Sequence, residues 1–235
     1  MLVLQSHRSE NLPEWIQRCM ESVREWAELV GAEYYCAGDR EVLSLLPVEF
    51  VRKLERRWPM LVDLGRLLLV KRALEAGEKR VVWLDADVLV FDPKAMRLPV
   101  GIKNGYAFGR EDWIEKSCKV RRGVHNALCV FEQGNPFLDY YIHACERIVE
   151  QHEGQHLAPQ LLGPKFLKMQ YNLLHFELCE SVAMLSPVVV QDMLEGEGRL
   201  WEKQKVQAEF GAVNLCGSLV DDASGLAAVR CLLGQ

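Results

Sequence analysis

The sequence predicts an α/β protein in which helices cover a mainly parallel sheet. Short β-rich segments alternate along the chain with segments of helical periodicity, and this order is typical of such sheets. The chain has 235 residues, of which 49% are hydrophobic, so one domain over residues 1–235 with a sizeable core is expected. No repeat, low-complexity segment or Pro/Ser-rich linker divides it.

In the first part of the chain, residue spacing and breaker residues define the elements. Apolar residues recur at helical spacing between Pro13, which begins a helix, and Gly31, which ends it. Pro59 and Gly77 interrupt or end the helical segments that follow. The predicted elements are strands over 2–5, 33–37 and 79–84 and helices over 13–31, 47–58 and 61–76.

Beyond Pro93 the predicted elements are shorter. The charged segment 110–123, which contains Trp113, is expected to be a loop, either a lid or acceptor loop or a surface loop without such a role. The other expected elements are strands near 105–109, 127–132 and 182–185, helices over 136–151 and near 159–169, and an irregular C-terminal segment.

Composition argues against some classes of function. The formal net charge of −5 is unlike that of a general nucleic-acid-binding protein, which is normally basic. No apolar run approaches the roughly 20 residues that span a bilayer. One basic cluster is interpreted as a solvated helix face, while an anionic-lipid or polyphosphate patch, and with it peripheral membrane contact, stays open; the cluster is Arg52, Lys53, Arg56 and Arg57.

Cysteine usage and the N-terminus favour a cytoplasmic location. The eight cysteines lack CxxC spacing, so they support neither a zinc ribbon nor a thioredoxin-like site and are typical of buried thiols in a reducing compartment. The first residues lack the basic segment and long apolar stretch of a secretory signal. A cytoplasmic protein is therefore expected, unless a targeting segment lies outside this chain.

The acidic triplet Asp85-Ala86-Asp87 directly follows an apolar β-rich run. Ligands of such sheets bind beyond the carboxyl ends of the strands. In an extended backbone Asp85 and Asp87 share a face, and two carboxylates beside a buried strand are costly without a cation or hydrogen-bond donors. A divalent cation that bridges protein carboxylate and substrate phosphates meets this need. The apolar flanks favour such a metal site over a turn with solvated aspartates.

Asp63 and Arg66 interrupt the predicted helix 61–76, which carries leucine or valine on nearly every face. Residues three apart lie on the same side of a helix, so the two side chains are neighbours. A surface ion pair is the ordinary interpretation of this spacing. Because so apolar a helix has little solvated face, we expect both groups to find partners in a pocket.

The segment LVDLGRLLLVKRALEAGEKRVVWLDADVLVF resembles the glycosyltransferase family named for its DXD-containing sugar-binding region, which includes initiating mannosyltransferases and bacterial capsule sugar transferases. The family pattern is an Asp-x-x-Arg helix, a short turn, and a hydrophobic strand that ends in DxD. Asp63, Arg66, Asp85 and Asp87 match this pattern in order and spacing. The resemblance implies a GT-A-like fold with a twisted, mainly parallel sheet.

Weaker similarities extend over most of the chain. The opening segment QSHRSENLPEWIQRCMESVREWA resembles the family's first strand and helix, which places Gln5 and His7 near the nucleotide base. The segment HNALCVF is similar to one in which an asparagine faces the donor sugar, here Asn126. The segment LLGPKFL resembles the family's Gly-Pro turn before a helix, at residues 163–164.

Near the C-terminus, AVNLCGSL is similar to a family element that usually reads His-x-x-x-Ser-Trp. Asn214 stands in place of the His and Leu219 in place of the Trp, so Asn214 and Ser218 are candidate metal ligands or diphosphate contacts. The family's usual Trp near the base and its Gly-Gly-x-Tyr turn before DxD are absent. The donor's identity therefore cannot be carried over.

The resemblance implies glycosyl transfer from a nucleoside diphosphate sugar to a hydroxyl of a saccharide or other acceptor, with retention of anomeric configuration. Asp87 would bind Mn or Mg, and Asp85 would contact the ribose or sugar. Asp63 and Arg66 would hold the sugar and stabilise charge at the leaving oxygen.

Three alternatives stay open. A haloacid-dehalogenase-type phosphatase also begins with a strand ending in DxD, but Val88 stands where that enzyme needs a hydroxyl residue, and the acidic pair Asp221-Asp222 lies in a Ser/Gly-containing tail. A catalytically impaired relative that binds nucleotide sugars is suggested by the Asn214 and Leu219 departures. The HExxH sequence at 152–156 is interpreted as a chance match to the zinc-protease motif, because it contains Gly154.

Overall fold

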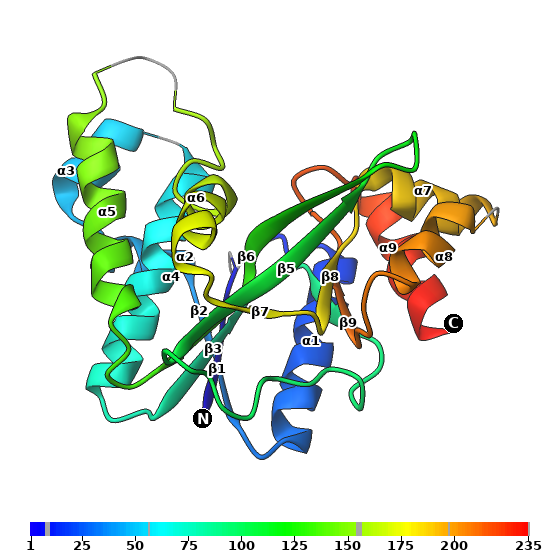
Figure 1. Ribbon diagram of the computed structural model, residues 1–235, viewed down its shortest axis with the longest axis horizontal. Coiled ribbons are helices and arrows are strands. Elements are labelled where there is room, and N and C mark those ends of the chain that lie inside the picture. The colour runs from blue at the N-terminus through cyan, green and yellow to red at the C-terminus, as the bar shows by residue number, and fades with distance from the viewer. Residues whose placement is uncertain (8–9, 56, 154–156, 197, 235) are drawn as a thin grey trace.

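A mixed sheet in the order β2-β1-β3-β6-β5-β7 lies at the centre of the computed structural model (Figure 1). The structure describes residues 1–235 except 8–9, 56, 154–156, 197 and 235. The strands of this sheet are β1 (Leu2–Ser6), β2 (Glu33–Ala37), β3 (Arg80–Leu84), β5 (Tyr106–Ile114), β6 (Val120–Glu132) and β7 (Glu177–Cys179).

Neighbouring strands are parallel at both ends of this sheet and antiparallel in between. Strand β1 is parallel to β2 and β3, and β5 is parallel to β7. Strand β6 is antiparallel to both β3 and β5. The α/β class with helices flanking a central sheet is therefore confirmed, and the antiparallel pairs arise because β5 and β6 form a hairpin, which needs no helical crossover.

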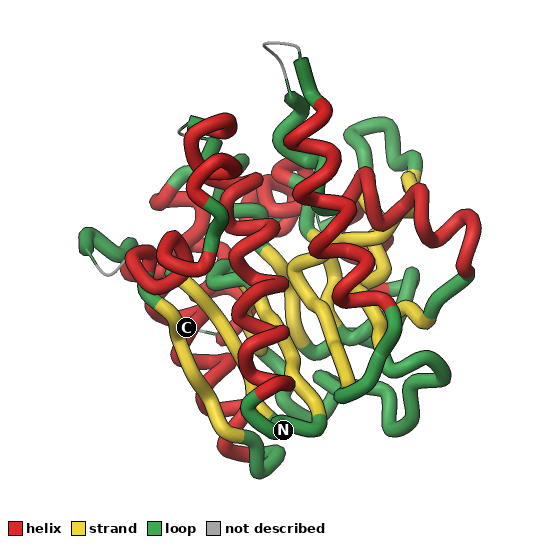
Figure 2. The backbone as a smooth tube through the Cα atoms, turned by 90° about the vertical axis from the view of Figure 1, so that its left-hand side faces the viewer, coloured by secondary structure: helices red, strands yellow, loops and turns green. Residues whose placement is uncertain are grey.

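Helices cover both faces of the sheet (Figures 1 and 2). Val81 and Trp83 of β3 pack into the core under α4 and α5, whereas Val82 and Leu84 pack under α1, because alternate side chains of a strand point to opposite faces. One face carries α2 (Asp39–Leu45), α3 (Val48–Leu54), α4 (Trp58–Glu75), α5 (Phe137–Gln151) and α6 (Pro164–Leu174), and the other carries α1 (Glu14–Leu29).

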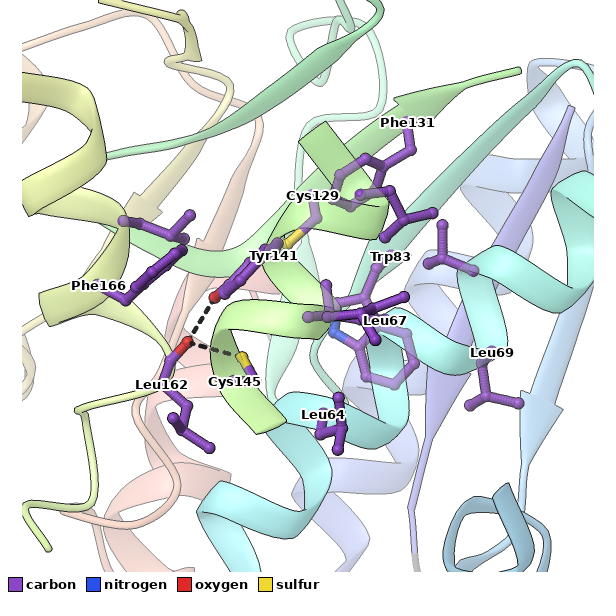
Figure 3. Packing of buried hydrophobic residues seen from close by; sticks show 14 of the residues in the cluster. Leu64, Leu67, Leu69, Trp83, Cys129, Phe131, Tyr141, Cys145, Leu162 and Phe166 are labelled. Carbon is purple, nitrogen blue, oxygen red and sulfur yellow. Dashed lines mark hydrogen bonds between the residues drawn. The ribbon is translucent and has the colours of Figure 1, made fainter. Parts of the chain in front are cut away.

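The core beneath α4 and α5 holds the segment that leads into α6 (Figure 3). The Tyr141 hydroxyl, on α5, donates to the backbone oxygen of Leu162 over 2.6 Å, and its ring stacks on Phe166 with centroids 4.8 Å apart. Gly65 sits on α4 where a Cβ would lie 2.4 Å from Val42 of α2, so only glycine allows this close approach. These contacts hold α6 against α5 and α4 against α2 on one face of the sheet.

A second, three-stranded sheet in the order β4-β9-β8 follows the triplet and packs among the C-terminal helices. Its strand β4 is antiparallel to β9, and β9 is parallel to β8. The elements are β4 (Val88–Val90), β8 (Val182–Met184), β9 (Ala212–Asn214), α7 (Pro187–Glu195), α8 (Arg199–Lys205) and α9 (Asp222–Leu233). The expectation of an irregular C-terminal segment is therefore wrong.

Other boundaries also differ from expectation. The predicted helix 47–58 ends at Leu54, and Pro59 lies in the first turn of α4, where its missing N–H costs nothing. The segment 110–123 is not a loop lid, because β5 and β6 continue through it as a hairpin. Among the residues that the structure describes, no helix combines the length and apolar character needed to cross a bilayer.

Candidate functional site

A cleft of about 750 Å³ opens where the carboxyl ends of β1 and β3 meet α4, the start of α6 and the start of α9. Most of the residues singled out in the sequence lie in it. The polar and charged residues that line it are Ser6, His7, Asp63, Arg66, Asp85, Asp87, Asn126, Gln160, Lys165, Ser218 and Asp222.

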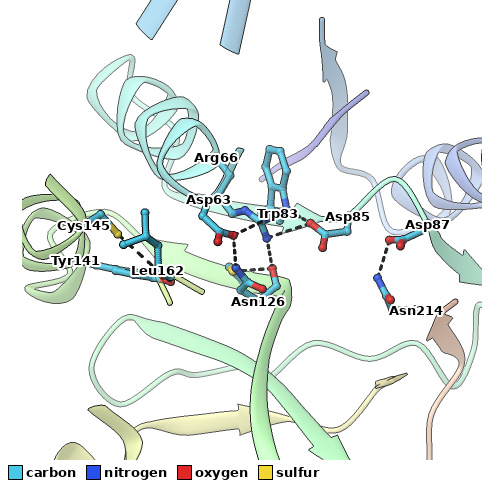
Figure 4. Close-up of polar contacts among 11 residues, drawn as sticks. Asp63, Arg66, Trp83, Asp85, Asp87, Asn126, Tyr141, Cys145, Leu162 and Asn214 are labelled. Carbon is cyan, nitrogen blue, oxygen red and sulfur yellow. Dashed lines mark hydrogen bonds and ion pairs between the residues drawn. The ribbon is translucent and has the colours of Figure 1, made fainter. Parts of the chain in front are cut away.

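The acidic triplet forms a turn between the two sheets, not an extended segment. The backbone N–H of Val88 donates to the oxygen of Asp85 over 3.1 Å, so the chain reverses between β3 and β4. As a result Asp85 and Asp87 take different partners, and Asp85 lies between the Asp63–Arg66 pair and Asp87 (Figure 4). The expectation that both side chains share a strand face is wrong.

Arg66 joins three groups at the cleft floor (Figure 4). Its Nη1 lies 3.0 Å from Oδ1 of Asp85 and donates to the backbone oxygen of Asn126 over 2.6 Å. Its Nη2 lies 3.2 Å from Oδ1 of Asp63. The guanidinium lies over the Trp83 ring, 5.2 Å from the centroid. Burial alone would lower the pKa of Arg66, but the charges of Asp85 and Asp63 outweigh it and raise that pKa. The expectation that Asp63 and Arg66 are buried with partners is confirmed.

Asp63 and Asn126 form the end of the cleft next to α6. Asn126, on β6, donates from Nδ2 to Oδ1 of Asp63 over 2.8 Å. Gly163 packs on both: a Cβ there would lie 2.7 Å from Nδ2 of Asn126 and 3.1 Å from Oδ2 of Asp63. Burial, the main effect, raises the pKa of Asp63 to about 6 against the lowering effects of Arg66 and Asn126.

Asp85 is held from its side chain and from its backbone. The indole N–H of Trp83, two residues earlier on β3, donates to Oδ1 of Asp85 over 2.7 Å. The Gln5 side chain donates to the backbone oxygen of Asp85 over 3.0 Å and accepts from the Tyr34 hydroxyl over 2.8 Å. Gln5 is fully buried and does not line the cleft, so it supports Asp85 instead of facing a base.

Asp87 is held by two donors from the chain near residue 215. Asn214, on β9, donates from Nδ2 to Oδ1 of Asp87 over 2.6 Å, and the backbone N–H of Gly217 donates to Oδ2 over 2.7 Å. Burial, followed by the charge of Asp85, raises the pKa of Asp87 to about 6. A cation near this carboxylate would oppose that effect.

The oxygen of Asn214 does not face the cleft. Its Oδ1 accepts from the backbone N–H of Cys216 over 2.8 Å, and its amide nitrogen faces Asp87. These two partners fix the amide orientation, because a backbone N–H needs an acceptor and a carboxylate needs a donor. In this arrangement Asn214 is a support for Asp87 and not the metal ligand that the sequence suggested.

The remaining residues nevertheless fit a divalent cation. Each oxygen of the Asp87 carboxylate accepts one hydrogen bond, and a carboxylate has about four acceptor sites, so lone pairs are left. Ser218 is exposed in the cleft and carries a hydroxyl. In the described part of the chain no three His, Cys, Asp or Glu residues gather as a ready metal site. This suits a cation such as Mg²⁺, which commonly uses one or two carboxylates and takes its other ligands from phosphates and water.

The other sequence candidates fall in different places. His7 lines the cleft, as expected of a residue near a bound ligand. The HExxH motif begins beyond the helix, since α5 ends at Gln151, and its residues 154–156 lie outside the described residues. Asp221 caps α9 through the N–H of Ser224, and Asp222 accepts from the Trp15 indole over 2.8 Å.

Arg52 and Lys53 of the basic cluster lie on α3 and do not line the cleft. Arg52 pairs with Glu49, and Lys53 donates to the backbone oxygen of Glu150 on α5. Arg56 lies outside the described residues. The solvated helix face is the interpretation that these contacts favour.

The sequence did not single out Trp83 or Lys165 as parts of this site, whereas Trp58, one of the tryptophans that the sequence offered for stacking on a sugar, does line the cleft. Trp83 had a detectable signal, because it lies two residues before Asp85 on the same strand face. Trp58 and Lys165 reach the cleft only because the starts of α4 and α6 converge there.

No family model and no curated protein matches the sequence. The structure is similar to that of a glycosyltransferase involved in the glycosylation of the major capsid of PBCV-1, with a TM-score of 0.53 and 12% identity over 97% of this chain and 98% of that one. It is also similar to the apo form of the glycosyltransferase GlyE of Streptococcus pneumoniae TIGR4, with a TM-score of 0.51 and 10% identity over 99% of this chain and 62% of that one. The chain therefore has a GT-A-like glycosyltransferase fold.

Proposed function

We propose that the protein is a glycosyltransferase that moves a sugar from a nucleoside diphosphate sugar to a hydroxyl of a saccharide or other acceptor. The observation that carries this proposal is the row of Asp63, Arg66, Asp85 and Asp87 along the floor of one cleft, on a glycosyltransferase fold. The donor nucleotide would enter beside His7 and Ser6, and the sugar would lie over Asp85 and Asn126.

Asp87, with the Ser218 hydroxyl, would hold a divalent cation, Mn or Mg, which neutralises the leaving diphosphate when bound. Arg66 carries a positive charge that is shared between two carboxylates, and so it orients Asp63 and Asp85. The same charge would stabilise the negative charge that develops on the leaving oxygen. Trp83 and Gln5 keep Asp85 in place. Because these side chains are already in place, little rearrangement is needed when charge develops in the transition state.

Retention of anomeric configuration is the stereochemical outcome that we propose. An inverting reaction needs a carboxylate or another base that is available to take a proton from the acceptor. In the described part of the chain, each carboxylate that lines the cleft has a protein donor as a partner, so none is an unpartnered group set apart to serve as that base. These carboxylates are Asp63, Asp85, Asp87 and Asp222.

A thermal-stability screen tests this function. Nucleoside diphosphates and their sugars are added with and without Mn²⁺ to the wild type, to Asp87→Ala and to Asp139→Asn, whose carboxylate is 78% exposed outside the cleft. A ligand at 100 times its dissociation constant adds about 2.7 kcal/mol of stability. At about 2–4 °C per kcal/mol for a chain of this size, this raises the melting temperature by roughly 5–11 °C. The rise should require Mn²⁺, persist in Asp139→Asn and disappear in Asp87→Ala.

Release of nucleoside diphosphate from the stabilising donor then separates the candidates. Release that increases with an added saccharide supports the transferase. A stability shift without any release favours the catalytically impaired relative, for which the engagement of Asn214 with Asp87 and Cys216 is the motivating observation. Stabilisation only by phosphate or a phosphate-mimicking fluoride complex would instead favour the phosphatase.

A further inference from the structure

One end of the cleft has an apolar wall, which is built by the first turn of α4. Trp58 and Pro59 lie at the start of this helix, and Val62 follows one turn later. The Trp58 side chain is 40% exposed, unlike Trp15 and Trp83, which also line the cleft but are 2% and 1% exposed. The indole N–H groups of Trp15 and Trp83 are bonded to Asp222 and Asp85. Of the three tryptophans that line the cleft in the described part of the chain, Trp58 is therefore the one with surface left for a ligand to cover.

The wall continues into the charged floor along one side of α4. Residues that line the cleft recur at positions i, i+1, i+4, i+5 and i+8 of this helix, which is the spacing of a single helix face. Its N-terminal end is apolar and its deeper end carries Asp63 and Arg66. Trp58 precedes Asp63 by five residues, so it lies about 7.5 Å farther along the helix axis. The apolar wall therefore lies farther toward the N-terminal end of α4 than the groups assigned to the donor sugar, by about the length of one sugar unit.

The start of α6 faces this wall across the cleft, and the two helices lie on the same side of the sheet (Figure 1). Pro159 and Pro164 add further apolar surface, while Gln160 and Lys165 supply polar groups at the rim. A pyranose ring matches this surface, because its C–H faces are apolar and its edges carry hydroxyl groups. A ligand without apolar surface would not cover the exposed ring of Trp58.

We propose that Trp58 and the first turn of α4 form the acceptor subsite, and that the acceptor is a saccharide whose pyranose ring stacks on the Trp58 indole. This inference rests on the proposed function, since it assigns the acceptor class of the same cleft. Covering the exposed 40% of a tryptophan removes roughly 60–100 Å² of apolar surface from water. That area corresponds to about a ten-fold or larger effect on acceptor binding.

A binding experiment tests the subsite without requiring turnover. Methyl pyranosides of glucose, galactose, mannose and xylose are titrated into the full chain with Mg²⁺ and a nucleoside diphosphate, and the indole N–H resonances are followed by NMR. The Trp58 resonance, assigned by its loss in Trp58→Phe, should move with at least one pyranoside. The resonance of Trp113, a partly exposed indole on β5 outside the cleft, should stay in place. Absence of any change at Trp58 overturns the proposal.

Kinetic measurements then test whether the Trp58 ring contacts the acceptor and not the donor. Trp58→Ala should raise the KM for the saccharide acceptor about ten-fold, while transfer of the donor sugar to water keeps its kcat and KM. Trp58→Phe, which retains a ring, should lie within about three-fold of the wild type. Parallel loss of donor hydrolysis in Trp58→Ala would place Trp58 on the donor side and sink the inference. If the wild type neither hydrolyses a donor nor transfers its sugar to a saccharide, the proposed function fails, and the pyranoside titration still decides the subsite.

Discussion

Replacement of Arg66 by methionine tests whether one buried cation holds the cleft floor together. The Arg66 side chain is 8% exposed, and that of Asp63 is 7% exposed. Arg66→Met keeps most of the side-chain volume but leaves Asp63, Asp85 and the backbone oxygen of Asn126 without their shared donor. Removal of one partner of a buried ion pair typically costs about 3–5 kcal/mol, because the remaining charge stays buried.

The assay is the free energy of unfolding from urea titration, with the melting temperature as a second measure. At about 2–4 °C per kcal/mol, the expected cost lowers the melting temperature by roughly 6–20 °C. Arg52→Met is the matched control: Arg52 and its partner Glu49 are 77% and 75% exposed, so its loss should change stability by less than about 1 kcal/mol. Arg66→Lys should lie in between, because a single ammonium cannot reproduce the geometry of the guanidinium fork.

The cost should also depend on pH. Burial raises the pKa of Asp63 to about 6 even with Arg66 present, and removal of Arg66 would raise it further. At pH 5 a protonated Asp63 needs no cation, so Arg66→Met should be less costly there than at pH 8. A variant as stable as the wild type at pH 8, or a cost that grows as the pH falls, would refute the assignment of Arg66 as the cation that both carboxylates require.

Three further expectations concern the same floor. Gly163→Ala should cost about 1–3 kcal/mol by displacing Asn126 and Asp63, whereas Gly101→Ala, which meets open space, should be neutral in the same urea titration. Because the folded-state pKa of Asp63 is raised from 3.8 to about 6, stability should fall by roughly 3 kcal/mol as the pH rises from about 4 to 6, and Asp63→Asn should remove that fall. Gln5→Leu should cost about 1–3 kcal/mol, since it leaves the Tyr34 hydroxyl and the Asp85 oxygen unpaired, and an unchanged urea midpoint would contradict the supporting role of Gln5.

Much of the first part of the fold was predictable because its signals are local. The strands and helices around the triplet carry clear apolar periodicity and end at Gly or Pro, and β2 begins and ends where the sequence indicates. The C-terminal part was not predictable in this way. Helix α9 contains Gly225, which is unfavourable in a helix interior, yet that glycine permits close packing on Trp15, where a Cβ would lie 2.7 Å from the ring. Long-range packing decided its structure.

The same difference between local signals and long-range packing applies to the residues of the candidate site. The i, i+3 spacing of Asp63 and Arg66 in an apolar helix predicted their burial, because that relation lies within one helix. The partners of Asp87 could not be predicted, since Asn214 and Gly217 are 127 and 130 residues away and meet it only when β4 and β9 pair. Asn214 looked like an oxygen ligand in the sequence, whereas its hydrogen bonds turn the nitrogen toward Asp87.

The charge balance of the floor links these contacts to the cation that the proposed reaction needs. The floor holds the carboxyl groups of Asp63, Asp85 and Asp87, and Arg66 supplies one positive charge that is already shared by Asp63 and Asp85. Asp87 receives only neutral donors, from Asn214 and Gly217. A donor diphosphate would therefore meet uncompensated negative charge at Asp87, and bringing like charges together in a partly buried cleft is unfavourable. A divalent cation at Asp87 converts this repulsion into attraction, which is why nucleotide binding should depend on both the cation and the Asp87 carboxylate.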